Sequence, residues 1–233
     1  MDTRSSMKIV SLVRTRNEER NIARFCRAHS WTDKTLVADG GSSDDTVAIA
    51  RTFPNVEVRL FLELVEGENL TFRNPEGKHI NFLINWAKTD GCDWMTLEDC
   101  DSFPTRKLQE LGKDLFVEAS RMDYSCIKLQ RVYLYGKDKW FSKNITNINW
   151  AWKPSLNIFV DEDDPWGIVT KNMPEIGYTL YPPLAMLHDF SPTPEIGKSK
   201  IDFYNKSEKM GKLPSLVEIF GELSDREDWM VDQ

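Results

Sequence analysis

Two carboxylates separated by one residue, Asp99 and Asp101, are the strongest candidates for chemistry in this sequence. They follow a short apolar run, Trp94–Leu97, and Glu98 stands directly before them. Carboxylate oxygens are hard ligands, so the pair could hold Mg²⁺ or Mn²⁺ and leave coordination positions open for phosphate oxygens. Acidic turns are common, but three acids in four residues repel one another unless a cation or a proton compensates. The spacing therefore predicts a divalent-ion site, with an acidic turn as the alternative.

A histidine far along the chain could complete this coordination. His188 follows an apolar stretch and precedes Asp189. Imidazole is a common ligand of divalent ions, and a neighbouring carboxylate can orient it. A single histidine can equally be a hydrogen-bonded residue of the core, and both interpretations stay open.

Asp39 ends a second apolar run, residues 35–38, and two glycines follow it. Its carboxylate could accept a hydrogen bond from a nucleobase N–H, as recognition of a uracil edge requires. The alternative is a turn-forming aspartate that accepts hydrogen bonds from the amides of Gly41 or Ser42.

Two further polar groups could take part in a transfer reaction. Asp163, within the acidic run 161–164, could serve as the general base that deprotonates an acceptor hydroxyl. Lys200 could contact a leaving diphosphate as a point charge. The alternatives are a solvated acidic loop and a solvated helix face.

Strands and helices alternate through the first half of the chain. Apolar runs at 8–14, 35–38, 56–61 and 94–97 predict strands, and helices are expected after Asn17, after Ser42 and around 80–87. Asn17 and the Ser42–Asp45 spacing are helix-capping signals. This alternation favours a mostly parallel sheet flanked by helices, in which ligands bind at the carboxyl ends of the strands. We therefore expect the polar clusters at 15–18, 39–46 and 98–101 to converge.

The second half is less regular. We predict a helix near 108–116, strands at 126–135 and 157–160, and long connections at 136–156 and 161–187. A final short helix is expected to begin at Ser215 and to lead into an acidic tail from Asp225 onward.

Composition limits the classes of function. The 233 residues suit one α/β domain, and the net charge of −7 argues against a general attraction to nucleic acid. Residues 121–153 nevertheless carry seven basic and two acidic side chains, a local charge of +5, with seven interleaved aromatic residues. This segment predicts either an acceptor surface that stacks on sugars or bases, or strands with aromatic core faces and solvated lysines. Four scattered cysteines and the absence of a 20-residue apolar run predict a cytoplasmic protein without a transmembrane segment.

Three segments resemble family 2 glycosyltransferases, which have the GT-A fold: residues 8–22, 36–51 and 93–101. A finer likeness is to the branch that contains lipopolysaccharide-core glucosyltransferases. It rests on Asn81-Phe82 before the acidic motif and on His188-Asp189-Phe190 with Lys200 after it. The chain departs from the family at Arg14-Thr15-Arg16, where proline-threonine-tyrosine is commoner.

The resemblance implies a role for each matching position. Thr15, Asn17 and Glu18 would line the nucleotide pocket, with Asp39 on the base and Ser42 nearby. Asp99 would contact the ribose or the metal, Asp101 and His188 would ligate Mn²⁺ or Mg²⁺, and Asn81 and Lys200 would help to bind the donor. Residues 1–105 would form the donor-binding half and 106–212 the acceptor-binding half of one Rossmann-like domain, with 213–233 a C-terminal helix and tail.

These observations predict a metal-dependent, inverting glycosyltransferase that moves a sugar from a nucleotide-sugar donor, in this family usually a UDP-sugar, to a glycan or another hydroxyl acceptor. The alternatives are a nucleotidyltransferase, a non-catalytic glycan-binding module, and a glycosyltransferase acting on modified DNA bases. The local positive charge permits a nucleic-acid acceptor, and the overall acidity argues against it.

Overall fold

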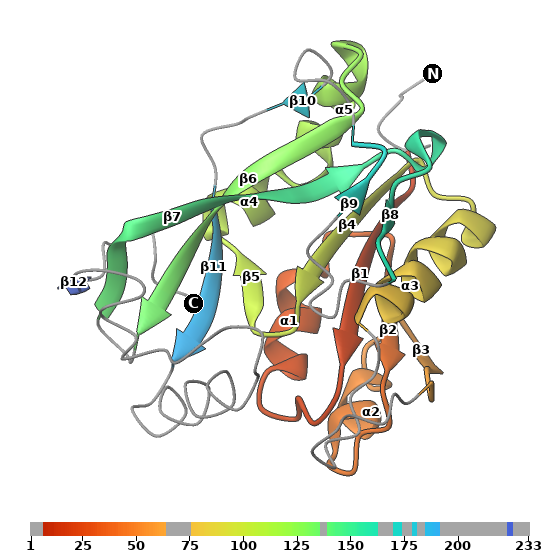
Figure 1. Ribbon diagram of the computed structural model, residues 1–233, viewed down its shortest axis with the longest axis vertical. Helices are drawn as coiled ribbons and strands as arrows, with labels where there is room; N and C mark the ends of the chain where they lie inside the picture. Colours follow the sequence, from red (N-terminus) through yellow and green to blue (C-terminus); the bar gives the residue numbers. More distant parts are fainter. Residues whose placement is uncertain are drawn as a thin grey trace.

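The computed structural model describes residues 7–63, 76–135, 139–162, 170–173, 179–180, 185–191 and 223–225. In these residues, one mixed sheet of ten strands forms the centre of the molecule, and β8 and β9 form a separate two-stranded sheet (Figure 1). The main sheet runs in the order β3-β2-β1-β4-β7-β6-β11-β5, with β10 beside β6 and β12 beside β7.

The first half builds the parallel part of the sheet, as predicted. Each strand is a run of apolar or β-branched residues, and the helices carry apolar residues on the face that they turn to the sheet. The strands are β1 (Ile9–Thr15), β2 (Lys34–Asp39), β3 (Val56–Leu60) and β4 (Trp94–Asp99). The helices are α1 (Ile22–Ala28), α2 (Thr46–Ala50) and α3 (Glu76–Asp90).

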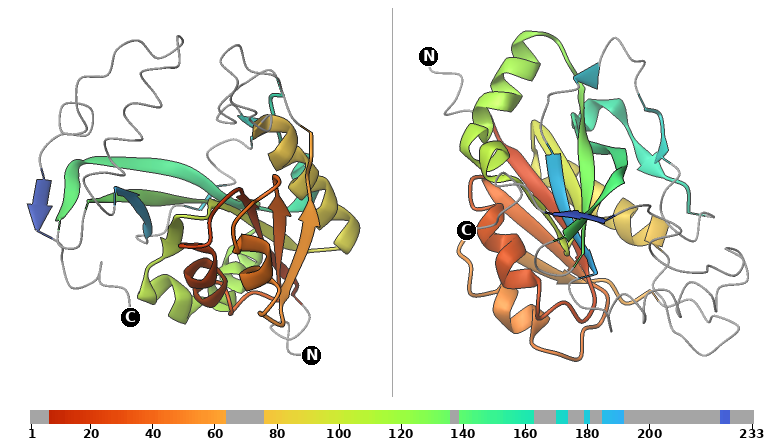
Figure 2. Two further views of the ribbon diagram at one scale, coloured as in Figure 1. Left: turned by 90° about the horizontal axis from the view of Figure 1, so that it is seen from below. Right: turned by 90° about the vertical axis from the view of Figure 1, so that its left-hand side faces the viewer.

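Helices cover the two faces of this sheet unequally. One face packs against α3 through residues such as Leu12, Met95 and Leu83. The other packs against α1 and α2 and, farther along the sheet, against α4 (Arg106–Leu111) and α5 (Lys113–Arg121). Figure 2 shows α3 and α1 on opposite sides of the strands. Successive side chains on a central strand therefore point alternately to the α3 face and to the α1 face of the sheet.

The second half adds mainly antiparallel strands. The longest of them, β7, has 14 residues and lies between β4 and β6, antiparallel to both. Farther out, β11 runs parallel to β6 and antiparallel to β5. The bounds are β5 (Ser102–Pro104), β6 (Cys126–Tyr135), β7 (Lys139–Trp152), β8 (Phe159–Val160), β9 (Thr170–Lys171), β10 (Thr179–Leu180), β11 (Ala185–Ser191) and β12 (Leu223–Asp225).

Two predictions for this half are wrong. Most of the expected connection 136–156 is β7, followed by a 3₁₀ turn at Pro154–Leu156, and the expected connection 161–187 contains β9, β10 and the start of β11. Lysines, asparagines and threonines interrupt the apolar pattern of β7, so its extended form depends on pairing with β6, whereas β4 pairs only with Ala151 and Trp152. The expected strand 157–160 shortens to Phe159–Val160, because Asn157 is left-handed with φ 51°.

The described part of the C-terminal segment is β12, which pairs antiparallel with β7. The sequence predicts a helix and an acidic tail for residues 213–233 and does not predict this strand; the helix expected from Ser215 lies outside the described residues. All four cysteines are free and buried, and no helix in the described part of the chain is long and apolar enough to cross a membrane.

Candidate active site

The predicted polar clusters meet at one edge of the sheet. In the parallel register, Arg14 lies beside Asp99 and Thr15 beside Asp39. The strands β1, β2 and β4 therefore end together, and the loops that follow them share this edge (Figure 1). The predicted convergence is confirmed for the strand ends at 15, 39 and 99.

Strand alternation separates the acids of the Glu98–Asp101 motif. Glu98 shares a face with Trp94 and Thr96 and is buried, at 2% exposure, on the α1 side. Its carboxylate accepts a hydrogen bond from Trp150 Nε1 and one from Ser11 Oγ at 3.3 Å, and it lies 3.2 Å from His29 Nε2. Glu98 is thus engaged by the core, which explains how three acids fit into four residues.

Asp99 points to the opposite, α3 side, where two arginines compensate its charge. Arg14 Nη2 lies 3.0 Å from Oδ1, and Arg131 Nη1 lies 3.4 Å from Oδ2. Burial by itself raises the pKa of Asp99. The charges of Arg14, Arg131 and His188 more than offset burial, so the pKa lies well below its ordinary value. The Asp99 carboxylate is therefore ionised at neutral pH.

Asp101 is joined to His188 through the pairing of β5 with β11. Ser102 lies opposite His188 in the antiparallel register, and the Asp189 amide donates to the Asp101 carbonyl at 2.8 Å. This places His188 Nδ1 3.3 Å from Asp101 Oδ1 and 2.7 Å from Ser102 Oγ. The ring of Tyr133 meets the imidazole edge-on, with centroids 5.3 Å apart. Pairing across 86 residues therefore brings the histidine to the acidic motif.

Asp99, Asp101 and His188 could together hold a divalent ion. One ligand atom from each lies within 4.8 Å of the others. Two carboxylates and an imidazole suit Mn²⁺ or Mg²⁺, and each Asp99 oxygen keeps a second lone pair beside its arginine. Asp99 and Asp101 are both partly exposed, so an ion and a ligand can reach them. The donor set fits the predicted ion.

Asp39 forms the turn after β2. Its Oδ1 accepts from Thr15 Oγ1 at 3.1 Å and from Ser42 Oγ at 2.5 Å. Its Oδ2 accepts from the amides of Gly41 and Ser42 at 3.0 and 2.8 Å. These contacts are those of the turn-forming alternative, and recognition of a base by Asp39 stays a prediction.

Asn17 and Glu18 fasten the loop after β1 to the loop after β2. Asn17 is left-handed, with φ 56°; its amide donates to Ser42 Oγ at 2.9 Å, and its Oδ1 accepts from the Ser43 amide at 2.8 Å. The Glu18 amide donates to Thr46 Oγ1 at 2.7 Å. The capping predictions are wrong, because α1 begins after Asn21 and the Ser42 hydroxyl serves Asp39 instead of α2. The two loops form one hydrogen-bonded unit at the predicted nucleotide pocket.

Asn81 holds a connecting segment against α3. Its amide donates to the Val160 carbonyl at 2.8 Å, and its Oδ1 accepts from the Val160 amide at 2.8 Å. Asn81 Nδ2 also lies 3.3 Å from Glu162 Oε1. Its role in donor binding stays a prediction, whereas its contact with the segment before Asp163 is direct. Asp163 and Lys200 themselves lie outside the described residues.

Gly77 allows this segment to approach the first turn of α3. A methyl group on Gly77 would lie 2.5 Å from the Asp161 carbonyl oxygen and 3.0 Å from Glu162 Cα. Gly77→Ala gains roughly 1 kcal/mol of helix propensity, but backbone overlap of this kind costs about 1–3 kcal/mol. We therefore expect a lower free energy of unfolding, measured by urea denaturation, with Lys78→Ala on the same helix as control. A variant more stable than wild type would show that the backbone at Asp161 and Glu162 can move away from the added methyl group without losing stability.

His79, buried next to the end of β2, should make the stability of the protein depend on pH. Its Nε2 donates to the Ala38 carbonyl at 2.8 Å, and Phe61 stacks on the ring. Burial lowers the pKa of His79 from 6.5 to about 4, and nearby Arg14 acts in the same direction. Because the unfolded chain binds the proton first, stability is lost as pH falls from about 6.5 to about 4, by roughly 3 kcal/mol at most. His79→Gln, which keeps a donor, should flatten the pH dependence of urea unfolding over that range. An unchanged slope would contradict this.

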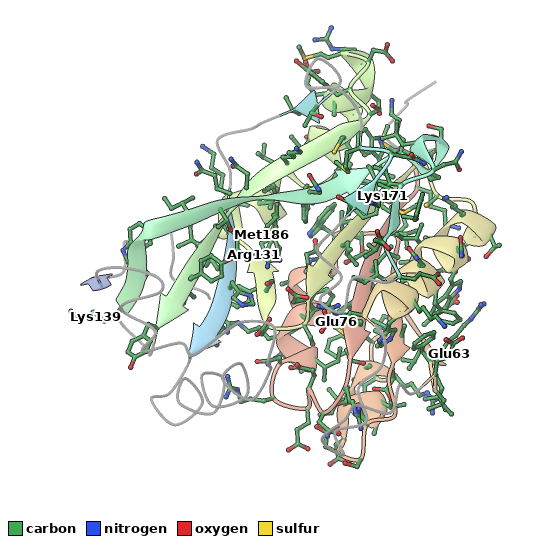
Figure 3. All side chains as sticks on the ribbon, viewed as in Figure 1. Glu63, Glu76, Arg131, Lys139, Lys171 and Met186 are labelled. Atoms are coloured by element: carbon green, nitrogen blue, oxygen red, sulfur yellow. The ribbon has the colours of Figure 1, made fainter. Side chains whose placement is uncertain are left out.

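Sequence reasoning missed three side chains around the ion site: Arg131, Glu76 and Tyr133. Glu76 lies 3.0 Å from Arg14 Nη1 and opens α3, whereas Arg131 comes from β6 (Figure 3). An arginine at position 14, at the end of a predicted buried strand, is a signal in the sequence, because a buried arginine needs a carboxylate partner. Arg131 was visible only as one member of the basic, aromatic segment.

No protein-family model matches the chain, and no curated protein matches it in sequence. Among solved structures, it is similar to S. aureus TarS, with a TM-score of 0.55 and 15% identity over 89% of this chain and 41% of that one. A shorter TarS structure, residues 1–349 in complex with UDP-GlcNAc, gives a TM-score of 0.52 and 13% identity over 78% of this chain and 58% of that one. The chain has the GT-A fold. It spans about two fifths of the full TarS chain, and identities this low establish the fold alone.

Proposed function

We propose that this chain is a glycosyltransferase that uses a UDP-sugar donor and a divalent ion. The observation that carries the proposal is the group Asp99, Asp101 and His188 at the carboxyl edge of the parallel strands. The GT-A fold supports it, since a TarS structure that shares this fold was solved with UDP-GlcNAc. A divalent ion held by these residues would supply positive charge next to the leaving diphosphate.

The hydrogen-bonded loops after β1 and β2 are our candidate for the nucleotide pocket. Thr15, Asn17, Glu18, Asp39 and Ser42 would line it, and their mutual contacts hold it in shape before a ligand arrives. In this proposal the Asp39 carboxylate accepts a hydrogen bond from the N–H of a uracil edge, and nearby backbone supplies the complementary donor. Preorganisation of this kind lowers the entropy cost of binding.

The proposed chemistry is a single displacement with inversion at the anomeric carbon. An acceptor hydroxyl attacks as a carboxylate takes its proton, and Asp163 is our candidate base. Its neighbours Asp161 and Glu162 pack against the first turn of α3, where Glu76 is linked through Arg14 to Asp99. Product with retained anomeric configuration would contradict this mechanism.

Membership of the lipopolysaccharide-core-like branch remains part of the proposal, supported by Asn81-Phe82 and His188-Asp189-Phe190 in the sequence. The acceptor would bind on the side of β6, where Arg131 and Tyr133 face the ion site. A glycan or another hydroxyl compound stacked on Tyr133 suits that surface.

The test is thermal stabilisation by a panel of nucleoside diphosphates and nucleotide sugars, with and without Mn²⁺. We expect UDP or one UDP-sugar to raise the melting temperature, and to do so more strongly when Mn²⁺ is present. Stabilisation by free glycans alone would favour a glycan-binding module. Release of pyrophosphate from a nucleoside triphosphate would favour a nucleotidyltransferase.

A further inference from the structure

Arg131 is a cation on the acceptor half that reaches into the ion site. It lies on β6 beside Met186 of β11, two residues before Tyr133, and its Nη1 is 3.4 Å from Asp99 Oδ2 (Figure 3). Its side chain is mostly buried, at 18% exposure. The carboxylate that it contacts is one of the three candidate ion ligands.

The two arginines on Asp99 are held very differently. Arg14 is fixed between two carboxylates, with both contacts at 3.0 Å, and these carboxylates raise the pKa of Arg14 although burial lowers it. Arg131 has one carboxylate contact, which is longer, where Arg14 has two. Within the described part of the structure each arginine also has one buried nitrogen without a hydrogen-bond partner, Nη1 of Arg14 and Nε of Arg131, but Arg14 Nη1 still lies 3.0 Å from Glu76 Oε2. A buried donor without a partner costs free energy until a ligand satisfies it. Arg131 is thus the arginine that can leave Asp99.

A divalent ion would make the charge of the site more positive by two units. Glu76, Asp99 and Asp101 oppose Arg14 and Arg131, which leaves one net negative charge when His188 is neutral, as a metal-ligating histidine is. With the ion added, the sum is one net positive charge. A guanidinium released next to that ion has the fork of donors that phosphate oxygens accept.

We propose that Arg131 exchanges partners: it pairs with Asp99 in the ion-free site, and it binds the donor's diphosphate once Asp99 turns to the ion. This inference rests on the proposed function and adds a residue from the acceptor half to the donor site. Arg131 therefore couples ion binding to nucleotide binding.

If Arg131 exchanges partners in this way, the Arg131→Gln substitution should change the affinities for Mn²⁺ and for UDP in opposite directions. Both affinities are measured by isothermal titration calorimetry. Mn²⁺ titrated alone should bind about two- to fivefold more tightly, because a competing partner of Asp99 is gone. UDP titrated in the presence of Mn²⁺ should bind about tenfold more weakly or worse, because a charged donor to phosphate is lost. Arg131→Lys should lie between wild type and Arg131→Gln for UDP.

Arg121→Gln is the matched control, because Arg121 is exposed on α5 and contacts Glu118 there. It should leave both affinities at the wild-type values. Unchanged UDP affinity in Arg131→Gln would overturn the proposal, and so would a parallel loss of Mn²⁺ and UDP binding, which indicates a merely structural role. If circular dichroism shows that Arg131→Gln is unfolded, Arg131→Lys carries the test, and wild-type UDP affinity in it overturns the exchange. Wild-type protein that binds neither Mn²⁺ nor UDP would refute the proposed function instead.

Discussion

Asp101→Asn is expected to abolish ion-dependent binding of UDP and to lower the rate of sugar transfer by roughly 100-fold or more. Asparagine keeps the size of the side chain but removes the charge that would hold a divalent ion together with His188 and Asp99. The measurements are Mn²⁺ and UDP titration calorimetry and transfer assayed with the UDP-sugar that stabilises the wild-type protein.

The fold should survive this substitution. Asp101 lies at the sheet edge, and its backbone carbonyl, which accepts from the Asp189 amide, is unchanged. Because asparagine keeps an oxygen next to the mostly buried His188, we expect the unfolding free energy to fall by about 1–2 kcal/mol, the cost of a weakened hydrogen bond. Wild-type turnover in Asp101→Asn would remove the ion-site assignment. Loss of activity together with unfolding would show that Asp101 has a structural role.

Glu98→Ala is expected to have the opposite profile and to lower the free energy of unfolding by about 3–5 kcal/mol. The substitution would leave Trp150 Nε1 and Ser11 Oγ without their acceptor and would open a cavity next to His29. Each buried polar group that loses its partner costs about 1–3 kcal/mol. Urea denaturation followed by tryptophan fluorescence measures this loss.

The two substitutions act three residues apart and control for each other. The folded fraction of Glu98→Ala, assayed at low temperature, should still bind Mn²⁺, because Glu98 faces away from the ion site. Glu98→Ala with wild-type stability would mean that water satisfies the buried donors. Loss of Mn²⁺ binding by folded Glu98→Ala would place Glu98 among the ligands and contradict the separation of the two faces.

Much of the donor half could be predicted from local patterns. The strands at 9–15, 34–39, 56–60 and 94–99 are apolar runs bounded by polar residues, and hydrophobic periodicity specifies such elements over short distances. Their alternation with helices implies parallel pairing, and parallel pairing brings the strand ends together. The meeting of Arg14 with Asp99 and of Thr15 with Asp39 follows from that logic.

The acceptor half was not predictable in the same way. β7 is rich in lysine, asparagine and threonine and becomes a strand because it pairs with β6 along most of its length, while β4 pairs with its last two residues. Such pairing depends on residues far away in the sequence, and β propensity carries little of that information. Asn17 and Ser42 show the same limit within one loop region. Both are residue types that often cap helices, but here the Asn17 amide donates to Ser42 Oγ, and Ser42 Oγ donates to Asp39.

The residue types and their order were sufficient to predict an acidic ion motif at the end of a parallel strand, because both depend on neighbours within a few positions. Tertiary structure decided which acids take part: Trp150 and Ser11 hydrogen-bond Glu98 on one face, and Arg14 compensates Asp99 on the other. Tertiary structure also decided which other residues join the site. His188 and Arg131 arrive through the pairing of β5, β11 and β6, and register between distant strands is set by the packing of the whole sheet.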